Sequence, residues 1–237
     1  MNYKIIQDEG AFDNFIEWLP ELETNETYLV SLLARKKYAN NDPLKGSVIS
    51  NQIMLKRFTT SKDHLKQKVR QLECPIGAYT INTTDGEAPA PQEMLALYIM
   101  PNPRNLLKAT RRVLHVLIDT LAVPHNKVEV KPEKDILSAI QTSPSTKHFS
   151  LFDFDGVTLE YTITKLNGIV NRDCVSVVRT RGGFHLLIQP NKVEAKYQNT
   201  WHTKVSGLEG LDVSGDLLMP VPGCTQGNFV PVFMPLV

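Results

Sequence analysis

Two aspartates separated by a single residue are the first feature of this sequence that suggests chemistry. Asp153 and Asp155 end the segment HFSLFDFD, whose apolar residues predict a strand from His148 to Asp155. Because strand side chains alternate between faces, both carboxylates should project from one face, with Phe152 and Phe154 buried on the other. Neighbouring carboxylates repel unless one is protonated or a cation lies between them, so the pair favours a divalent hard metal ion. A strand end whose acids only face water remains the alternative.

A second segment, SVVRTRGGFHLLIQP, predicts two strands joined by a turn at Gly182 and Gly183. In a hairpin, a glycine pair supplies positive φ and allows a substrate close to the backbone, so phosphate is expected against these amides. Arg179 and Arg181 add positive charge next to the turn. His185, at the start of the returning strand, is expected to reach the face that carries the two aspartates. A purely structural histidine is the alternative.

A third segment, GLDVSGDLLMPVPGCTQGN, carries two further acids, Asp212 and Asp216, and ends in a Gly-rich stretch with Thr225 and Gln226 as hydrogen-bond donors. Three carboxylates beside phosphate donors match the needs of two-metal nucleotidyl transfer. In that reaction, cations activate the attacking hydroxyl and neutralise the departing pyrophosphate.

In this order, the three segments resemble the motifs of the archaeo-eukaryotic primase superfamily. Those motifs are an apolar strand with D-x-D, a turn of small residues that ends in histidine, and an apolar residue followed by aspartate. The likeness covers about residues 149–229 and is greatest to the compact primase-polymerases of phages and plasmids. The stretches LLARKKY and YIMPNPRNLLKA resemble the N-terminal half of those enzymes.

The resemblance implies a DNA primase or polymerase that transfers nucleotides from (d)NTPs to a 3′-hydroxyl on a single-stranded DNA template, with a helicase or other replication protein as a partner. Mg²⁺ or Mn²⁺ is the implied cofactor, and no zinc is expected because the zinc module is missing. The implied metal ligands are Asp153, Asp155 and Asp212, with Asp216 in reserve for the third. The implied nucleotide-binding residues are Thr180, Arg181, Gly182, Gly183 and His185. Further expected contacts to phosphate or template are Arg35, Lys36, Lys37, Arg104 and Gln226.

Two other functions fit parts of the pattern. FDFDGV also resembles the nucleophile motif of haloacid dehalogenase-type phosphatases, with Asp153 as nucleophile and Lys192 or Lys196 as the lysine. Against this, about 150 residues precede the motif, and the Gly-Gly-Phe-His segment has no role in such an enzyme. A non-catalytic nucleic-acid-binding protein is the other alternative, but acids on the binding face repel phosphate.

The remaining pattern predicts an α+β protein. From residue 148 onward, the expected order of strands and helices is β-α-β-β-α-β, a split βαβ arrangement like that of RNA-recognition domains, with helices on one face of an antiparallel sheet. The predicted elements are strands at 148–155, 174–180, 184–189 and 217–221 and helices at 159–169 and 193–205. We expect one catalytic module, with an N-terminal α/β part at about residues 1–145 and the metal- and nucleotide-binding part at about 146–237.

The N-terminal part is expected to hold the template. Residues 35–70 contain ten basic and two acidic residues, with Tyr38 and Phe58 among them, which fits either a nucleic-acid surface or a solvated helix face. Thr27 to Arg35 reads as a buried strand or a short helix, Met94 to Met100 as a strand, and Thr80 to Gln92 as a solvent loop. Pro103 is expected in the first turn of a helix that ends at Pro124, and a shorter helix is expected from Pro132 to about Gln141. The apolar residues of the first helix are expected in the core: Leu106, Leu107, Val113, Leu114, Leu117, Ile118 and Leu121.

Composition restricts the class of protein further. The 237 residues carry a formal charge of +1, so any nucleic-acid surface must come from local clustering. The three cysteines, Cys74, Cys174 and Cys224, form no C-x-x-C pair, which argues against a zinc ribbon or a disulfide scaffold. The acidic start lacks the pattern of a signal peptide, and no apolar run is long enough for a membrane span. The sequence therefore predicts a cytoplasmic or nuclear protein without a membrane partner.

Overall fold

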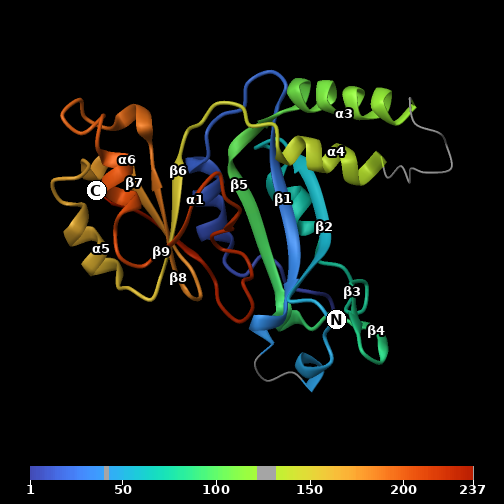
Figure 1. Cartoon of the computed structure of the whole chain (residues 1–237). Helices are drawn as coiled ribbons and strands as arrows, with labels where there is room; N and C mark the ends of the chain where they lie inside the picture. Colours follow the sequence, from blue (N-terminus) through green and yellow to red (C-terminus); the bar gives the residue numbers. More distant parts are fainter. Residues whose placement is uncertain (40–42, 122–131, 237) are drawn as a thin grey trace.

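Two antiparallel sheets and the helices around them make up the fold, which is of the mixed α+β class that the sequence predicts. The computed structural model describes residues 1–39, 43–121 and 132–236. Figure 1 shows helix α1 (Glu9–Trp18) between the two sheets and the pair α3 (Leu106–Leu121) and α4 (Pro132–Gln141) at one end of the first sheet. No helix in the described ranges is long and apolar enough to cross a bilayer.

The first sheet has the strand order β10-β5-β1-β2. Its strands are β1 (Glu26–Arg35), β2 (Gln52–Thr60), β5 (Leu95–Asn105) and β10 (Met219–Pro220). Strand β1 lies between two neighbours and is buried on both faces along all but its end residues, which explains why Ser31 alone interrupts the apolar run from Tyr28 to Ala34. Of the two alternatives for this segment, the strand is therefore confirmed.

The second sheet has the strand order β11-β7-β8-β6-β9, and every neighbouring pair is antiparallel. Its strands are β6 (Ser150–Asp155), β7 (Val175–Arg179), β8 (Gly183–Ile188), β9 (Leu211–Gly215) and β11 (Val232–Pro235). Helices α5 (Leu159–Leu166) and α6 (Trp201–Ser206) pack with one face of this sheet around Phe152 and Phe154. The predicted burial of these two phenylalanines is confirmed.

Two predictions for the C-terminal part are wrong. The strand expected at 217–221 pairs with β5 of the first sheet as β10, and β9 takes the expected place beside β6. The helix expected at 193–205 is much shorter, because only Trp201–Ser206 is α-helical and a 3-10 turn at Pro190–Lys192 precedes it. The chain therefore returns to the first sheet after β9, and each sheet contains residues from the C-terminal part.

The other face of the second sheet packs into a core that it shares with the first sheet. Leu151, Val178 and Leu187 from this face lie in one cluster with apolar residues of β1, β5 and α1. Trp18 of α1 stacks on Phe149 with ring centroids 4.6 Å apart, which joins α1 to the start of β6. Asp153 and His185, two residues farther along β6 and β8, therefore face the space between the sheets.

The segment expected to be a solvent loop forms a hairpin of β3 (Thr80–Thr83) and β4 (Gly86–Pro89). Its turn contains an Asp-Gly pair, which is typical of tight hairpins, and Gly86 has a φ of 119°. Ile81 and Thr83 are buried while their neighbours are exposed, so this short strand has the alternation that the proline-rich context obscured.

Helix α3 also differs from the sequence prediction. Pro103 lies within β5 and not in the helix. Strand β10 pairs with β5 only at Tyr98 and Ile99, so Pro103 lies beyond that pairing, where a strand tolerates the missing N–H. The apolar stripe of α3 is largely not core, since Leu114 is 53% and Ile118 63% exposed. Helix α4, which begins and ends as predicted, covers only one side of α3. Pro124 and the side chain of Leu121 lie outside the described residues.

The basic segment at 35–70 is not one solvated helix face. It contains the end of β1, the 3-10 turn Lys36–Tyr38, strand β2 and the short helix α2 (Leu65–Arg70). Two of its cations pair with acids of α1: Lys66 with Asp13 at 2.7 Å and Arg70 with Glu9 at 2.8 Å. Those paired cations therefore stabilise the packing of α2 against α1.

Candidate active site

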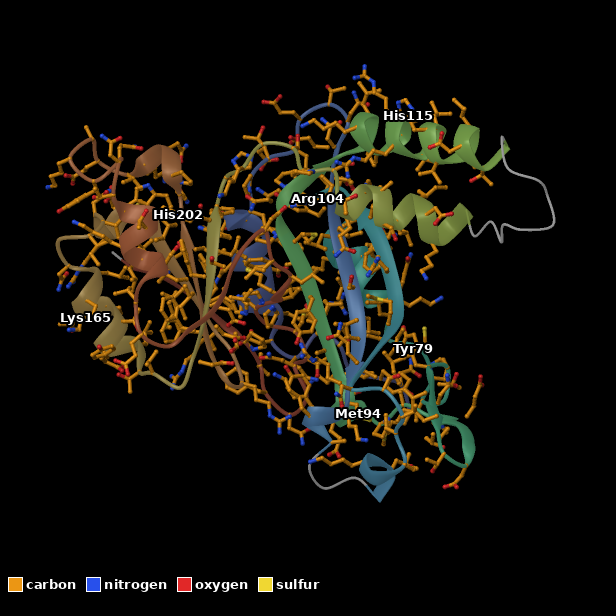
Figure 2. All side chains as sticks on the ribbon, in the orientation of Figure 1. Tyr79, Met94, Arg104, His115, Lys165 and His202 are labelled. Atoms are coloured by element: carbon orange, nitrogen blue, oxygen red, sulfur yellow. The ribbon has the colours of Figure 1, made fainter. Side chains whose placement is uncertain are left out.

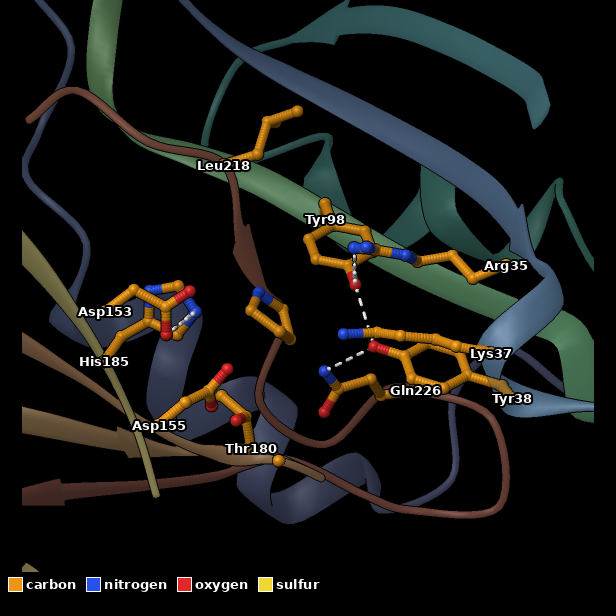
Figure 3. Close-up of a pocket in the computed structure, with 12 residues that line it drawn as sticks. Arg35, Lys37, Tyr38, Tyr98, Asp153, Asp155, Thr180, His185, Leu218 and Gln226 are labelled. Carbon is orange, nitrogen blue, oxygen red and sulfur yellow. Dashed lines mark hydrogen bonds and ion pairs between the residues drawn. The ribbon is translucent and has the colours of Figure 1, made fainter. Parts of the chain in front are cut away.

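A pocket of about 100 Å³ lies where the two sheets meet. In Figure 3, Asp153, Asp155, His185 and Thr180 approach it from the second sheet, and Arg35, Lys37, Tyr38 and Tyr98 approach it from the first. The remaining lining residues are Gly182, Leu218, Pro220 and Gln226. Sequence segments far apart therefore contribute acids from one side and cations from the other.

The acid pair projects from one face of β6, as predicted. Both carboxylates line the pocket, while Phe152 and Phe154 lie on the opposite face in the core with α5 and α6. Burial, followed by the negative charges of Asp155 and Asp212, raises the pKa of Asp153 to about 6, against the smaller opposing effects of Lys37 and Arg35. The surroundings of Asp153 thus disfavour its negative charge, and a bound cation would relieve this.

Asp212 reaches this group through an irregularity in β9. Phe154 pairs with Leu211 and Asp153 pairs with Val213, so Asp212 is the extra residue of a β-bulge. Such bulges redirect side chains and are common beside active sites. Asp212 is not a lining residue of the pocket, but its charge acts on Asp153.

Asp216 is held elsewhere. It forms an ion pair with Arg104 and accepts a hydrogen bond from Asn102 Nδ2 at 3.2 Å. Arg104 is 1% exposed and also donates to the carbonyls of Asn102 and Gln141; Figure 2 shows it on β5 close to α4. Arg104 does not line the pocket, and its donors bond to protein groups, so its placement supports a structural role instead of a contact to phosphate or template. Asp212 is the better candidate for a third carboxylate.

His185 faces Asp153 across the β6–β8 pair. The two residues are partners in register, with His185 Nε2 at 3.5 Å from Asp153 Oδ1. The imidazole is nearly buried, and burial lowers its pKa to about 4, so the ring is neutral at pH 7. Its Nδ1 atom is buried and has no hydrogen-bond partner among the residues that the structure describes. A histidine with only a structural role would normally satisfy this atom within the protein.

The glycine turn between β7 and β8 is tight for a reason that differs from the prediction. Neither Gly182 nor Gly183 has positive φ. Instead, a Cβ on Gly183 would lie 2.0 Å from the carbonyl oxygen of Phe154 and 2.7 Å from Asp155 Oδ1. Gly183 N also donates to Thr180 Oγ1 at 3.2 Å, which closes the turn. The glycine therefore permits β8 to approach the acid pair closely, and the expectation of positive φ was wrong.

A chain of hydrogen bonds connects this turn to the first sheet. Arg181 N donates to Gln226 Oε1 at 2.9 Å, and Gln226 Nε2 donates to Tyr38 OH at 3.0 Å. The hydroxyls of Tyr38 and Tyr98 share a hydrogen bond of 3.1 Å, and Arg35 donates to Tyr98 OH at 3.0 Å. The guanidinium of Arg181 also lies over the Tyr38 ring, 4.9 Å from its centroid. This network fixes the position of the turn relative to the cations of β1.

The expected phosphate contacts in the first sheet divide into two groups. Arg35 and Lys37 line the pocket as expected, whereas Lys36 points away and donates to the carbonyl of Val48 at 2.6 Å. Gln226 lines the pocket, but both ends of its buried amide bond to protein groups, so its placement supports a structural role instead of a template contact.

Three residues that line the pocket carry no signal in the sequence: Tyr98, Leu218 and Pro220. Tyr98 lies inside the apolar run of β5 and looks like an ordinary core residue in sequence. Pro220 is beside it only because β10 pairs with β5, a long-range contact without a local signal. The sequence signals for this side of the pocket were the cations Arg35 and Lys37 and the aromatic Tyr38 beside them.

A second pocket of about 440 Å³ adjoins the first and shares Thr180 and Gly182 with it. Arg179 and Arg181 line it, together with Thr158 and the first residues of α5. The side chain of Thr158 caps α5 by accepting from Tyr161 N at 3.2 Å. The glycine turn thus separates the pocket of Asp153 and Asp155 from a larger pocket lined by two arginines and one carboxylate, that of Glu160.

No three or more histidine, cysteine, aspartate or glutamate side chains within residues 1–39, 43–121 and 132–236 form a ready metal-binding group. Asp153 and Asp155 nevertheless fit a magnesium ion, which is commonly held by one or two carboxylates, waters and substrate phosphates. The raised pKa of Asp153 comes first from burial and then from the charges of Asp155 and Asp212, and a bound cation would offset both effects.

Comparison with protein-family models, with curated proteins and with solved structures finds no match to this chain. The resemblance to primase-polymerases therefore depends on the three sequence motifs and on how the structure arranges their residues.

Proposed function

We propose that the protein is a template-directed nucleotidyltransferase of the primase-polymerase type. The main support is that Asp153 and Asp155 face Arg35 and Lys37 within one pocket, with the neutral His185 and the glycine turn beside them. An acid pair opposite cations suits a metal-bound nucleotide, in which positive and negative charge lie side by side. The proposed substrates are (d)NTPs and a single-stranded DNA template, with a helicase or other replication protein as a partner.

The arrangement of the second sheet supports the finer proposal of a split βαβ fold. Chain order β6-α5-β7-β8-α6-β9 combines with the spatial order β7-β8-β6-β9, and the helices contribute to the core on one face. This arrangement leaves the opposite face of β6 and β8 for Asp153 and His185. The first sheet, which supplies Arg35 and Lys37, would be the template-holding part of the same module.

Each side chain has a role that follows from its position. Asp153 and Asp155 would hold Mg²⁺ or Mn²⁺ in the pocket, with Asp212 on the neighbouring strand as the candidate for a third carboxylate. When bound, the ion neutralises charge and lowers the pKa of an attacking hydroxyl. His185, neutral because it is buried, would orient the nucleotide through its ring nitrogens without adding charge. Arg179 and Arg181 in the adjoining pocket would bind the phosphates of the nucleotide, and the glycine turn would bring those phosphates near the acids.

The phosphatase alternative has less support. It needs Lys192 or Lys196 near Asp153, but neither residue lines the pocket, and Lys196 pairs with Glu194 at 2.7 Å. Such a phosphatase also needs acids late in the chain, for which Asp212 and Asp216 are the candidates, and Asp216 is bound to Arg104. A non-catalytic nucleic-acid binder would gain nothing from two carboxylates at the binding face, because they repel phosphate.

The test is a primer-extension assay on single-stranded DNA with (d)NTPs and Mg²⁺ or Mn²⁺. Asp153→Asn, Asp155→Asn and His185→Ala should lose extension and keep DNA binding. Arg172→Gln serves as the control, because this exposed residue precedes β7, at the end of the strand opposite to the glycine turn. Extension by the Asp153 and Asp155 variants at the wild-type rate would reject the mechanism. Metal-dependent release of phosphate from a small phosphomonoester without template would favour the phosphatase, and undiminished DNA binding with no activity in any variant or in the wild type would favour the binder.

A further inference from the structure

Three polar atoms that lack a hydrogen-bond partner in the described part of the chain gather on one face of the first sheet. They are Ser31 Oγ, Arg35 Nε and Arg57 Nε, and all three are buried from solvent. Ser31 and Arg35 are four residues apart on β1 and thus share a face, and Arg57 is the cross-strand partner of Ser31 on β2. This face is opposite to the one that packs on α1 through Val30 and Leu32.

These atoms belong to a continuous row across the sheet. Ser31 pairs in register with Arg57 on one side and with Tyr98 of β5 on the other. The side chain of Arg35 extends toward this row, because it donates to Tyr98 OH at 3.0 Å. Arg35 and Tyr98 also line the pocket that contains Asp153, so the row begins at the candidate active site.

At its other end, the row opens into a groove of about 440 Å³ between β2 and α4. Its described lining residues include three cations and no carboxylate: Met54, Leu55, Lys56, Arg57, Lys134, Leu137 and Ser138. The row of Arg35, Ser31 and Arg57, whose buried polar atoms lack partners in the described part of the chain, thus connects this positively charged groove to the pocket that contains Asp153.

A buried guanidinium N–H without an acceptor is unfavourable, and arginine cannot relieve this by losing its proton. The acceptor that two arginines would share along one row is an anion with several oxygens at regular intervals. A phosphate backbone meets this requirement, and arginine binds phosphate through paired N–H groups.

We propose that this row is the path along which a single strand of nucleic acid leaves the active-site pocket, crossing β5, β1 and β2 to the groove beneath α4. The path deepens the proposed function and depends on it for the identity of the strand. Arg35 and Arg57 each bind a phosphate, and Lys56 and Lys134 bind the strand in the groove. An acidic peptide has similar charge, but the connection to a pocket suited to nucleotides favours nucleic acid.

The experiment measures the affinity of the protein for labelled oligothymidylate of about 16 nucleotides over a range of salt concentrations. Arg57→Gln should weaken binding about tenfold and reduce the slope of log K against log salt by about 0.7, the contribution of one phosphate contact on a single strand. Arg172→Gln, which removes the same charge from a distant surface, should change neither. Arg57→Lys should restore the slope but only part of the affinity, because it keeps the charge and loses the Nε donor. Ser31→Ala, read by its melting temperature, should not destabilise the fold, since its hydroxyl has no partner to lose.

Equal affinity and slope for wild type and Arg57→Gln, in protein shown to be folded by its melting temperature, would overturn the path. Competition by polyglutamate as effective as that by oligothymidylate would overturn the choice of nucleic acid. The two proposals fail separately. If the wild type extends primers but Arg57→Gln binds oligothymidylate with unchanged affinity and salt slope, only the path is rejected. If Arg57→Gln changes the salt slope but the wild type never extends a primer, only the polymerase function is rejected.

Discussion

Gly183 offers the sharpest test of how the acid pair is positioned. Replacing it with alanine places a Cβ 2.0 Å from the Phe154 carbonyl oxygen and 2.7 Å from Asp155 Oδ1, and both contacts are far inside van der Waals distance. The atom at 2.0 Å belongs to the backbone of β6, so it cannot rotate away as the end of a side chain would. Strand β8 must therefore move away from β6 near the pairs Phe154–Phe184 and Asp155–Gly183.

We expect Gly183→Ala to destabilise the protein by about 2 to 3 kcal/mol, the upper part of the range for overpacking a close contact. Positive φ adds nothing to this figure, since Gly183 does not adopt it. The matched control is Gly182→Ala, whose Cβ would lie 3.3 Å from Asp155 Oδ1, a contact that a small rotation of the carboxylate relieves. This control should cost less than about 1 kcal/mol.

Urea unfolding of the two variants and wild type, followed by tryptophan fluorescence, gives the comparison. Primer extension by the folded fraction gives the second reading, and Gly183→Ala should lose far more activity than Gly182→Ala because the carboxylate of Asp155 is displaced. Equal stability of the two variants would refute the claim that close approach, and not the turn conformation, requires glycine here.

Three further predictions follow from the burial and charge of named residues. Because the pKa of Asp153 is raised to about 6, its contribution to stability falls as pH increases from about 4 to 6, by roughly 3 kcal/mol at most. The lowered pKa of His185 has the opposite effect on stability, which falls as pH decreases below about 6.5. The contribution of Asp153 is therefore obtained by comparing the unfolding free energies of wild type and Asp153→Asn in urea at pH 4 and at pH 8. Asp153→Asn should be relatively more stable at pH 8, and an unchanged difference would contradict this. Arg104→Met should destabilise the fold by about 3 kcal/mol, because a buried cation and its bonds to two carbonyls are lost. Asp216→Asn should also lower the melting temperature, because it removes the charge that pairs with Arg104. A loss of primer extension at an unchanged melting temperature would instead indicate that Asp216 is a metal ligand. Ile118→Gln should change the unfolding free energy by less than about 0.5 kcal/mol, since the side chain is 63% exposed. A larger loss of stability would show that Ile118 is buried in the core.

Local patterns in the sequence identified the strands whose surroundings are simple. Strands β6, β7 and β8 were predicted from short apolar runs, and the shared face of Asp153 and Asp155 followed from alternation alone. The same reasoning failed for α3, where Leu114 and Ile118 repeat at helical spacing but meet solvent. Periodicity shows that a helix has an apolar side, but it does not show how much of that side a neighbour covers.

Long-range pairing accounts for most of what the sequence did not predict at the site. Tyr98 and Pro220 meet because β10 joins β5, and Gln226 bonds to Tyr38 although they are 188 positions apart in the chain. The requirement for Gly183 is likewise set by β6, a strand outside its own hairpin. Residue type alone suggested positive φ there, and only the packed sheet reveals the clash that excludes a side chain.

The division of charge across the pocket restricts what can bind there. The effects of Lys37 and Arg35 on Asp153 are smaller than those of burial and of the two neighbouring acids, so the pKa of Asp153 stays high. A purely anionic ligand would therefore meet uncompensated repulsion at the acids, and a purely cationic one would meet Arg35 and Lys37 on the facing sheet. A cation and a phosphate bound together satisfy both sides, because each reduces the charge that the other faces. On this reasoning, metal and nucleotide should bind cooperatively, with the affinity for each increased by the presence of the other.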